Sequence, residues 1–154
     1  TTEIYTLSLH DALPILSTRR ICFNRRILPC LHSKGKLMTN RLEEFQTYRS
    51  RMNERILSIQ HLGIKRFFNL DSNAYNDGAL DAKTKELLGL TASMVLRCND
   101  CIDYHILQCI AAGWSDEELY EAFNVALIVG GSIVIPHLRH AVETLDLARA
   151  STTD

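Results

Sequence analysis

The 154-residue chain has little proline and little glycine, only 3 and 7 residues. Together with 46% hydrophobic residues, this excludes collagen-like repeats and argues against a disordered chain. Long apolar runs are also missing, since no stretch approaches the ~20 residues of a membrane-spanning helix. The formal net charge of −1 leaves no basic excess of the kind that nucleic-acid-binding domains carry. We therefore expect one globular domain that binds neither nucleic acid nor a membrane.

Cysteine is sparse as well. The 5 cysteines are odd in number and too few for a small domain held together by disulfides. A reducing compartment is therefore expected, and we predict a cytoplasmic protein.

The composition changes along the chain. Residues 1–37 hold six basic side chains against two acidic ones, a balance of +4, which leaves −5 for residues 38–154. Residues 1–15, TTEIYTLSLHDALPI, resemble the conceptual translation of a standard sequencing adapter and are set aside from reasoning about the fold. Residues 16–37 are rich in arginine and free of acids, which fits translated upstream sequence or a transit peptide. We expect residues 1–37 to be a non-native, disordered extension and residues 38–154 to form the domain, starting at Met38.

Hydrophobic periodicity predicts helices from residue 39 onward, because apolar residues recur at steps of three and four. The breaks between helices are marked by turn formers at 71–78, by Gly113 and by Gly130 with Gly131. Ser115 opens a capping box that should begin a helix. No convincing strand pattern is present, so the fold class is all-α with five to six helices. The predicted helices cover residues 39–62, 80–97, 98–112, 116–130 and 132–150, with a short turn at 64–70.

The domain after Met38 has only 117 residues, so its core is small. Phe67 and Phe68 in the short segment are expected to anchor that core. A chain of this size gains stability by burying a second apolar face against a partner, and apolar residues gather around the junction at 130–136. A homo-oligomer is therefore expected.

The stretch that carries chemistry runs from Cys98 through Cys101 to His105. At ~100° per residue the three side chains share one face of a helix, and the two sulfurs lie one turn apart, within reach of a disulfide. In a first helical turn, free amide groups and the helix dipole would lower the pKa of the Cys98 thiol, and Arg97 would act in the same direction. His105 could give a proton to either sulfur or take one from it. Redox activity, metal binding and simple burial remain alternatives for this CxxC pair.

Metal binding can be tested by geometry. Cys109 shares the helix face with Cys98, Cys101 and His105, which suggests a four-ligand zinc site. At ~1.5 Å rise per residue, however, Cys98 and Cys109 are about 16 Å apart, too far for zinc bonds of ~2.0–2.3 Å. We expect no metal and no other cofactor, and we expect Cys109 to be a small buried apolar residue. Glu86, twelve residues before Cys98, is either a solvated glutamate or a further titratable group of the site.

Family resemblance favours the second reading of Glu86. The pattern Glu86-x11-Cys98-x2-Cys101-x3-His105 resembles the carboxymuconolactone decarboxylase-like superfamily, and within it the alkylhydroperoxidase D-like branch. The likeness continues through Gly113, the acidic helix start at 116–118 and the glycine pair, and it covers residues 75–148. It implies an all-α helical bundle that forms homo-oligomers, here a trimer or a hexamer. It also implies that Glu86 and His105 relay protons around a redox-active disulfide between Cys98 and Cys101.

The function implied by the resemblance is a thiol-dependent peroxidase or disulfide oxidoreductase, with peroxiredoxin-type activity. Its substrate would be a peroxide or another small molecule, and an external dithiol reductant would restore the thiols. An alternative is a non-redox lyase that decarboxylates or isomerises a small lactone, with Glu86 and His105 as acid and base. A third is a non-catalytic helical oligomer that binds a partner or senses redox state.

The chain departs from the family pattern at one point. The founding peroxidase has a second histidine between its cysteines, where this chain has Asn99 and Asp100. An acidic Asp100 beside a developing thiolate would raise the pKa of that thiol and oppose the effect of the helix dipole.

Three polar residues follow Pro136, and they are expected to form a polar helix face or a subunit contact, with lining of the site as the alternative: His137, Arg139 and His140.

Overall fold

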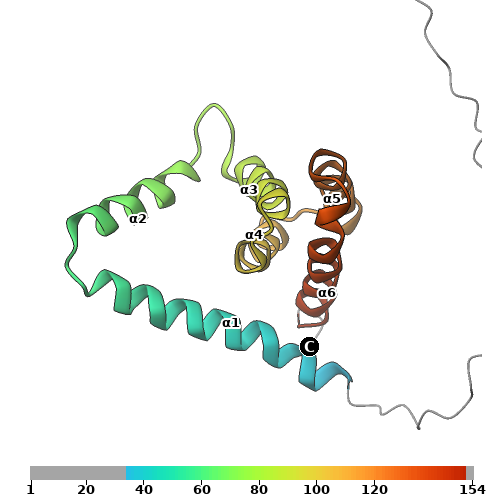
Figure 1. Cartoon of the computed structure of the whole chain (residues 1–154), viewed down its shortest axis with the longest axis horizontal. Helices are drawn as coiled ribbons and strands as arrows, with labels where there is room; N and C mark the ends of the chain where they lie inside the picture. The colour runs from blue at the N-terminus through green and yellow to red at the C-terminus, as the bar shows by residue number, and fades with distance from the viewer. Residues whose placement is uncertain (1–33, 152–154) are drawn as a thin grey trace, which may run out of the picture. The chain divides into compact units, whose positions relative to one another are not determined.

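The computed structural model describes residues 34–151, and this part of the chain consists of helices without any strand (Figure 1). The helices are α1 (Lys34–Leu57), α2 (Leu62–Ala74), α3 (Ala82–Leu96), α4 (Asn99–Ala111), α5 (Asp116–Gly130), the short 3-10 helix η2 (Ser132–Val134) and α6 (Ile135–Ser151). The predicted all-α class and the number of helices are confirmed. None of the helices in this range is long and apolar enough to cross a membrane.

The predicted extension at residues 1–37 lies almost entirely outside the described residues, so it stays a prediction. Helix α1 begins at Lys34, four residues before Met38.

The core is built by α3, α4, α5 and α6, and the apolar periodicity of each of these helices faces it. Helices α3 and α5 pack against each other, as do α3 and α4, and α6 closes the bundle against α4. Met94, Ile102, Ile106 and Phe123 are among its fully buried or nearly buried side chains. Full burial of a side chain of this size stabilises a fold by ~1.5–3 kcal/mol, so these four helices form the rigid frame on which the site is placed.

Helix α2 departs most from the prediction. Residues 71–74 continue the helix instead of starting a loop, because their polar side chains bond within the helix. The Ser72 hydroxyl donates to the Phe68 carbonyl at 2.9 Å, and the Asn73 amide donates to the Asn69 side chain at 3.0 Å. The prediction that Phe67 and Phe68 anchor the core is wrong, because α2 buries none of its residues. Phe67 is 69% exposed, and Phe68 is half-buried and belongs to neither core cluster.

Helix α1 is fastened to the bundle near its start. Leu42 packs on the α6 residues Leu147 and Ala148. Beside them a buried polar cluster forms around the Asp103 carboxylate of α4, which accepts from Arg41 at 3.1 Å, Thr144 at 2.6 Å and His140 at 2.7 Å. Burial alone would raise the pKa of Asp103, but the hydrogen bonds from His140 and Thr144 and the nearby charge of Arg41 outweigh it and lower the pKa.

We expect Asp103→Asn to destabilise the fold by about 1–3 kcal/mol, because it removes the buried carboxylate that accepts from Arg41, His140 and Thr144. Since the folded pKa of Asp103 lies below its ordinary value of 3.8, its contribution is complete well above pH 3.8 and is lost as the pH falls through the folded pKa. The cost of the substitution should therefore shrink between pH 7 and about pH 3. Urea unfolding at both pH values measures it.

Asp146→Asn serves as the matched control, because Asp146 is an exposed acid of α6. Its effect should stay within about 0.5 kcal/mol at both pH values. If Asp103→Asn lowers the free energy of unfolding equally at both pH values, the negative charge of Asp103 does not contribute to stability as proposed.

Candidate active site

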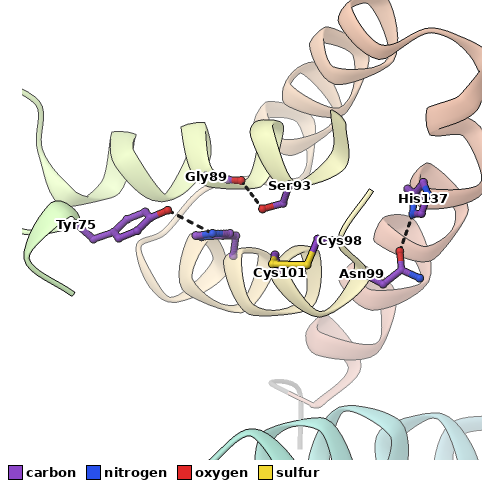
Figure 2. The surroundings of a disulfide bond; sticks show 8 residues. Tyr75, Gly89, Ser93, Cys98, Asn99, Cys101 and His137 are labelled. Carbon is purple, nitrogen blue, oxygen red and sulfur yellow. Dashed lines mark hydrogen bonds between the residues drawn. A yellow bond between two sulfur atoms is a disulfide. The ribbon is translucent and has the colours of Figure 1, made fainter. Parts of the chain in front are cut away.

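The two cysteines of the CxxC motif lie at the start of α4, directly after a sharp turn from α3. Arg97 ends α3 in the left-handed conformation, with φ of 63° and ψ of 39°, which is a common way to end a helix. The chain then reverses, so that Cys98 becomes the N-cap of α4 and Cys101 its third residue. The Cα atoms of the two cysteines are 5.3 Å apart and their sulfurs form a disulfide (Figure 2).

The two sulfurs have different surroundings. Cys101 is exposed, whereas Cys98 is half-buried and its backbone N–H donates to the Ser93 carbonyl of α3 at 3.0 Å. The N-cap position places Cys98 beside the free amide groups of the first turn of α4, which stabilise a negative charge there. A reduced Cys98 is therefore suited to carry a thiolate, and Cys101 is the sulfur that a molecule from solvent reaches first.

His105 and Glu86 form the titratable pair of the site. His105 follows Cys101 by one turn on α4, and Glu86 lies on α3, which packs against α4. His105 Nδ1 and Glu86 Oε2 are 2.7 Å apart, and their side chains are only 9% and 12% exposed. Because a carboxylate oxygen only accepts, Nδ1 carries the hydrogen, and the lone pair of neutral His105 is on Nε2. The four site residues predicted from the sequence thus lie together at the interface of α3 and α4.

Three residues that the sequence did not reveal complete the surroundings of His105. The Tyr75 hydroxyl lies 3.5 Å from Nε2 (Figure 2). The Tyr104 ring meets the imidazole edge-on with centroids 5.1 Å apart. Burial first, and then the charge of Glu86, raise the pKa of Tyr75, so its hydroxyl stays protonated near neutral pH. Gly89, three residues after Glu86, leaves room for both groups: a Cβ there would be 2.6 Å from Cε1 of His105 and 2.8 Å from the Tyr75 oxygen.

A pocket of about 620 Å³ opens beside the disulfide, between α1, α2 and α4. Cys101 and His105 both belong to its lining, whereas Cys98 does not. Seven of the other twelve lining residues are apolar or aromatic, and three are charged: Arg49, Asp71 and Asp100. The Arg49 guanidinium lies 4.0 Å above the Tyr104 ring. A small organic molecule that enters here meets Cys101 and His105 side by side.

The other candidate residues lie away from this pocket. Cys109 is fully buried, and burial first, then the charge of Glu86, raise its pKa to about 12, so the prediction of a buried apolar residue is confirmed. His137 bonds to the Asn99 side chain at 2.7 Å (Figure 2), and His140 bonds to Asp103 at 2.7 Å, so both histidines connect α6 to α4 within one chain. Arg139 is exposed. Among the residues that the structure describes, no three histidine, cysteine or acidic side chains are grouped so that they could hold a metal ion.

Comparison with known proteins identifies the family of the chain. The model of the carboxymuconolactone decarboxylase family matches residues 64–144, which include α3, α4 and α5. A curated relative from Paracoccus denitrificans, the uncharacterized protein 4 in cox locus, is 31% identical over 80 residues, or 52% of this chain and 72% of the relative.

Two solved structures are similar over most of their length. A carboxymuconolactone decarboxylase family protein from Thermotoga maritima, for which an antioxidative role has been suggested, is 55% identical with a TM-score of 0.69, covering 71% of this chain and 93% of that one. A protein of the same family from Legionella pneumophila is 28% identical with a TM-score of 0.55, covering 75% of this chain and 95% of that one. The fold and the site thus define a helical protein with paired cysteines beside a glutamate–histidine pair. The chain belongs to the carboxymuconolactone decarboxylase family.

Proposed function

We propose that the protein is a thiol-dependent peroxidase, a disulfide oxidoreductase in which Cys98 and Cys101 cycle between dithiol and disulfide. The observation that carries this proposal is the Cys98–Cys101 disulfide at the mouth of a pocket that also holds His105, paired with Glu86. A disulfide at a helix N-terminus, with Cys101 exposed and a histidine whose Nε2 lone pair faces only the Tyr75 hydroxyl at 3.5 Å, has the parts that thiol redox chemistry needs. The antioxidative role suggested for the Thermotoga maritima relative points the same way.

Cys101 is the sulfur that attacks the peroxide in this proposal, because it is exposed and lines the pocket together with His105. His105 Nε2 takes the proton of the Cys101 thiol, and Glu86 stabilises the imidazolium that forms. The thiolate then attacks one peroxide oxygen, so that an S–O bond forms while the O–O bond breaks. His105 returns its proton to the departing alkoxide or hydroxide, and Cys101 is left as a sulfenic acid.

Cys98 completes the oxidation. Its thiolate attacks the sulfenic sulfur of Cys101, which forms the disulfide and breaks the S–O bond, and the departing hydroxide takes up the proton that the Cys98 thiol gave up and leaves as water. The two thiols have then given two electrons to the peroxide, which has become an alcohol or water. An external dithiol returns the electrons by attacking the disulfide and leaves as a disulfide itself. Attack on the exposed Cys101 sulfur expels Cys98, and the N-terminus of α4 stabilises the leaving thiolate.

Treating the reduced full-length chain with one equivalent of hydroperoxide tests the proposal. We expect the peptide that contains Cys98 and Cys101 to lose two hydrogen atoms by mass spectrometry, with both cysteines closed to alkylation. Cys109 is an internal control, because its buried thiol, with a pKa of about 12, should stay free and react with the alkylating agent only after denaturation. Cys98 and Cys101 thiols that stay free after excess peroxide would contradict the proposal.

The non-redox alternative rests on Arg49. It is a cation in the wall of the same pocket, and a guanidinium there could hold a carboxylate of a small lactone while Glu86 and His105 act as acid and base. Loss of carbon dioxide from such a lactone that survives Cys98→Ser and Cys101→Ser together would favour the lyase over the peroxidase.

A further inference from the structure

The Tyr75 hydroxyl belongs to the pocket wall and lies 3.5 Å from His105 Nε2. In the proposed reaction Nε2 is the atom that takes the proton of the Cys101 thiol, whereas Nδ1 is bonded to Glu86. The rings of Tyr75 and His105 meet at an angle of 37°, with centroids 5.4 Å apart. In Figure 2 the Tyr75 hydroxyl points toward α4, in the direction of the disulfide. The hydroxyl therefore extends the row of polar groups from Glu86 through His105 into the pocket.

The loop after α2 fixes Tyr75 relative to the other groups of the site. Tyr75 is the C-cap of α2, and the carbonyl of the next residue, Asn76, accepts from Lys85 Nζ. The Asp77 carboxylate accepts from the first amide of α3 at 2.7 Å. Lys85 belongs to α3, the helix that also carries Glu86. The helix that holds the partner of the imidazole thus also holds the segment that carries the phenol.

Gly89 of α3 makes the approach of the phenol to the imidazole possible. A Cβ at this position would lie 2.8 Å from the Tyr75 oxygen and 2.6 Å from Cε1 of His105. A glycine inside a helix is less stable than an alanine, so this residue is unfavourable for α3 by itself. The space that it leaves is filled by the two groups that can exchange a proton.

Tyr75 keeps its proton until a strong base reaches it. Burial first, and then the charge of Glu86, raise the pKa of Tyr75 above its ordinary value of 10.0. The pKa of water is about 15.7, so a hydroxide or an alkoxide that leaves a peroxide still takes this proton. Tyr104 also lines the pocket, but it contacts the imidazole through its ring and holds the Arg49 guanidinium 4.0 Å above that ring. Tyr75 is therefore the tyrosine whose hydroxyl is placed for proton transfer.

The attack on a peroxide needs protons at two places. His105 Nε2 must lie beside the Cys101 sulfur to take the proton of the thiol. The leaving oxygen lies on the far side of the oxygen that is attacked, because the new S–O bond and the breaking O–O bond are in line. A second group farther along the pocket is better placed to protonate the leaving oxygen, and the Tyr75 hydroxyl is such a group.

We propose that Tyr75 is a further catalytic residue of this site, the group that gives a proton to the leaving oxygen of the peroxide; this role rests on the proposed function. As the Cys101 sulfur bonds to the terminal oxygen and the O–O bond breaks, the Tyr75 O–H proton passes to the leaving oxygen. The imidazolium of His105 then gives its Nε2 proton, which came from the thiol, to the Tyr75 oxygen. One thiol and one hydroperoxide thus become one sulfenic acid and one alcohol or water, and Tyr75 and His105 end in their starting states.

The leaving group of the oxidant tests this role in the full-length chain. The alkoxide that leaves tert-butyl hydroperoxide needs a proton as the O–O bond breaks, whereas peracetic acid releases acetate, which is stable as an anion. We expect Tyr75→Phe to slow the single-turnover oxidation of Cys101 by about 10²-fold or more with the hydroperoxide and by less than about threefold with the peracid. Rapid quenching with an alkylating agent, followed by peptide mass spectrometry, measures both rates.

Tyr120→Phe is the matched control, because it removes the same hydroxyl from a tyrosine of α5 that is 47% exposed and lies outside the pocket. It should leave both rates unchanged. Equal losses of Tyr75→Phe with the two oxidants would indicate a purely structural role and overturn the proposal, and so would the absence of any loss. A wild-type dithiol that reacts with neither oxidant would overturn the proposed function before any variant is compared, and the role of Tyr75 with it.

Discussion

Replacing Cys101 by serine is expected to reduce peroxide consumption by about 10³-fold or more. The thiolate is the nucleophile, and a serine hydroxyl forms almost no anion near neutral pH without a strong base. Cys98→Ser should behave differently, because Cys101 can still attack once and then has no partner for the disulfide. The Cys98→Ser protein should therefore consume one equivalent of peroxide and stop, with the sulfenic acid on Cys101. Rapid-mixing kinetics and a sulfenic-acid trapping reagent read by peptide mass measure both outcomes.

Cys109→Ala is the control for these variants. A fully buried thiol with a pKa of about 12 is not a nucleophile at neutral pH, so its removal should leave the rate within about threefold, at some cost in stability. The reverse pattern, with the trapped sulfenic acid on Cys98 in Cys101→Ser and an inert Cys98→Ser, would exchange the roles of the two sulfurs.

The helices that build the core could be predicted because their signals are local. The capping box at Ser115 forms as expected: the Ser115 hydroxyl accepts from the Glu118 amide at 3.3 Å and the Glu118 carboxylate accepts from the Ser115 amide at 2.8 Å. The exposure of Phe67 on α2 could not be predicted in this way. Periodicity indicates that a helix has an apolar face, but it does not say whether the surface that covers this face belongs to the same chain.

The site residues also fall into two groups, those that local sequence spacing predicts and those whose position depends on how the helices pack. The spacing of Cys98, Cys101 and His105 along one helix fixes their common face, so the sequence alone places them together. Tyr75 and Arg49 reach the site from other elements, and their contacts depend on how the helices pack. Gly89 had a local signal that could have been used, since a glycine inside a helix, three residues after Glu86, indicates a close approach by another group.

Replacing His105 by glutamine should lower the rate of Cys101 oxidation by about 10²–10³-fold, because the proton acceptor of the thiol and the donor to the leaving oxygen are lost together.

Glu86→Gln tests how Glu86 orients the His105 imidazole. A glutamine amide can donate to Nδ1, which moves the imidazole hydrogen to Nε2 and blocks the lone pair that the thiol needs. We expect a loss of about 10²-fold, with the rate measured under single-turnover conditions.

Gly89→Ala separates geometry from chemistry, since it keeps both titratable groups and adds one Cβ at 2.6 Å from the His105 ring. The ring must shift away from Glu86 Oε2, so we expect the oxidation rate of Cys101 to fall at least about tenfold. The free energy of unfolding should change only by the cost of repacking the side chain.

Because Glu86 acts through His105, the double variant Glu86→Gln with His105→Gln should be about as slow as His105→Gln alone. If the rate losses of the two single variants multiply in the double variant, Glu86 acts on the reacting atoms directly and not through His105, which would contradict the proposed relay.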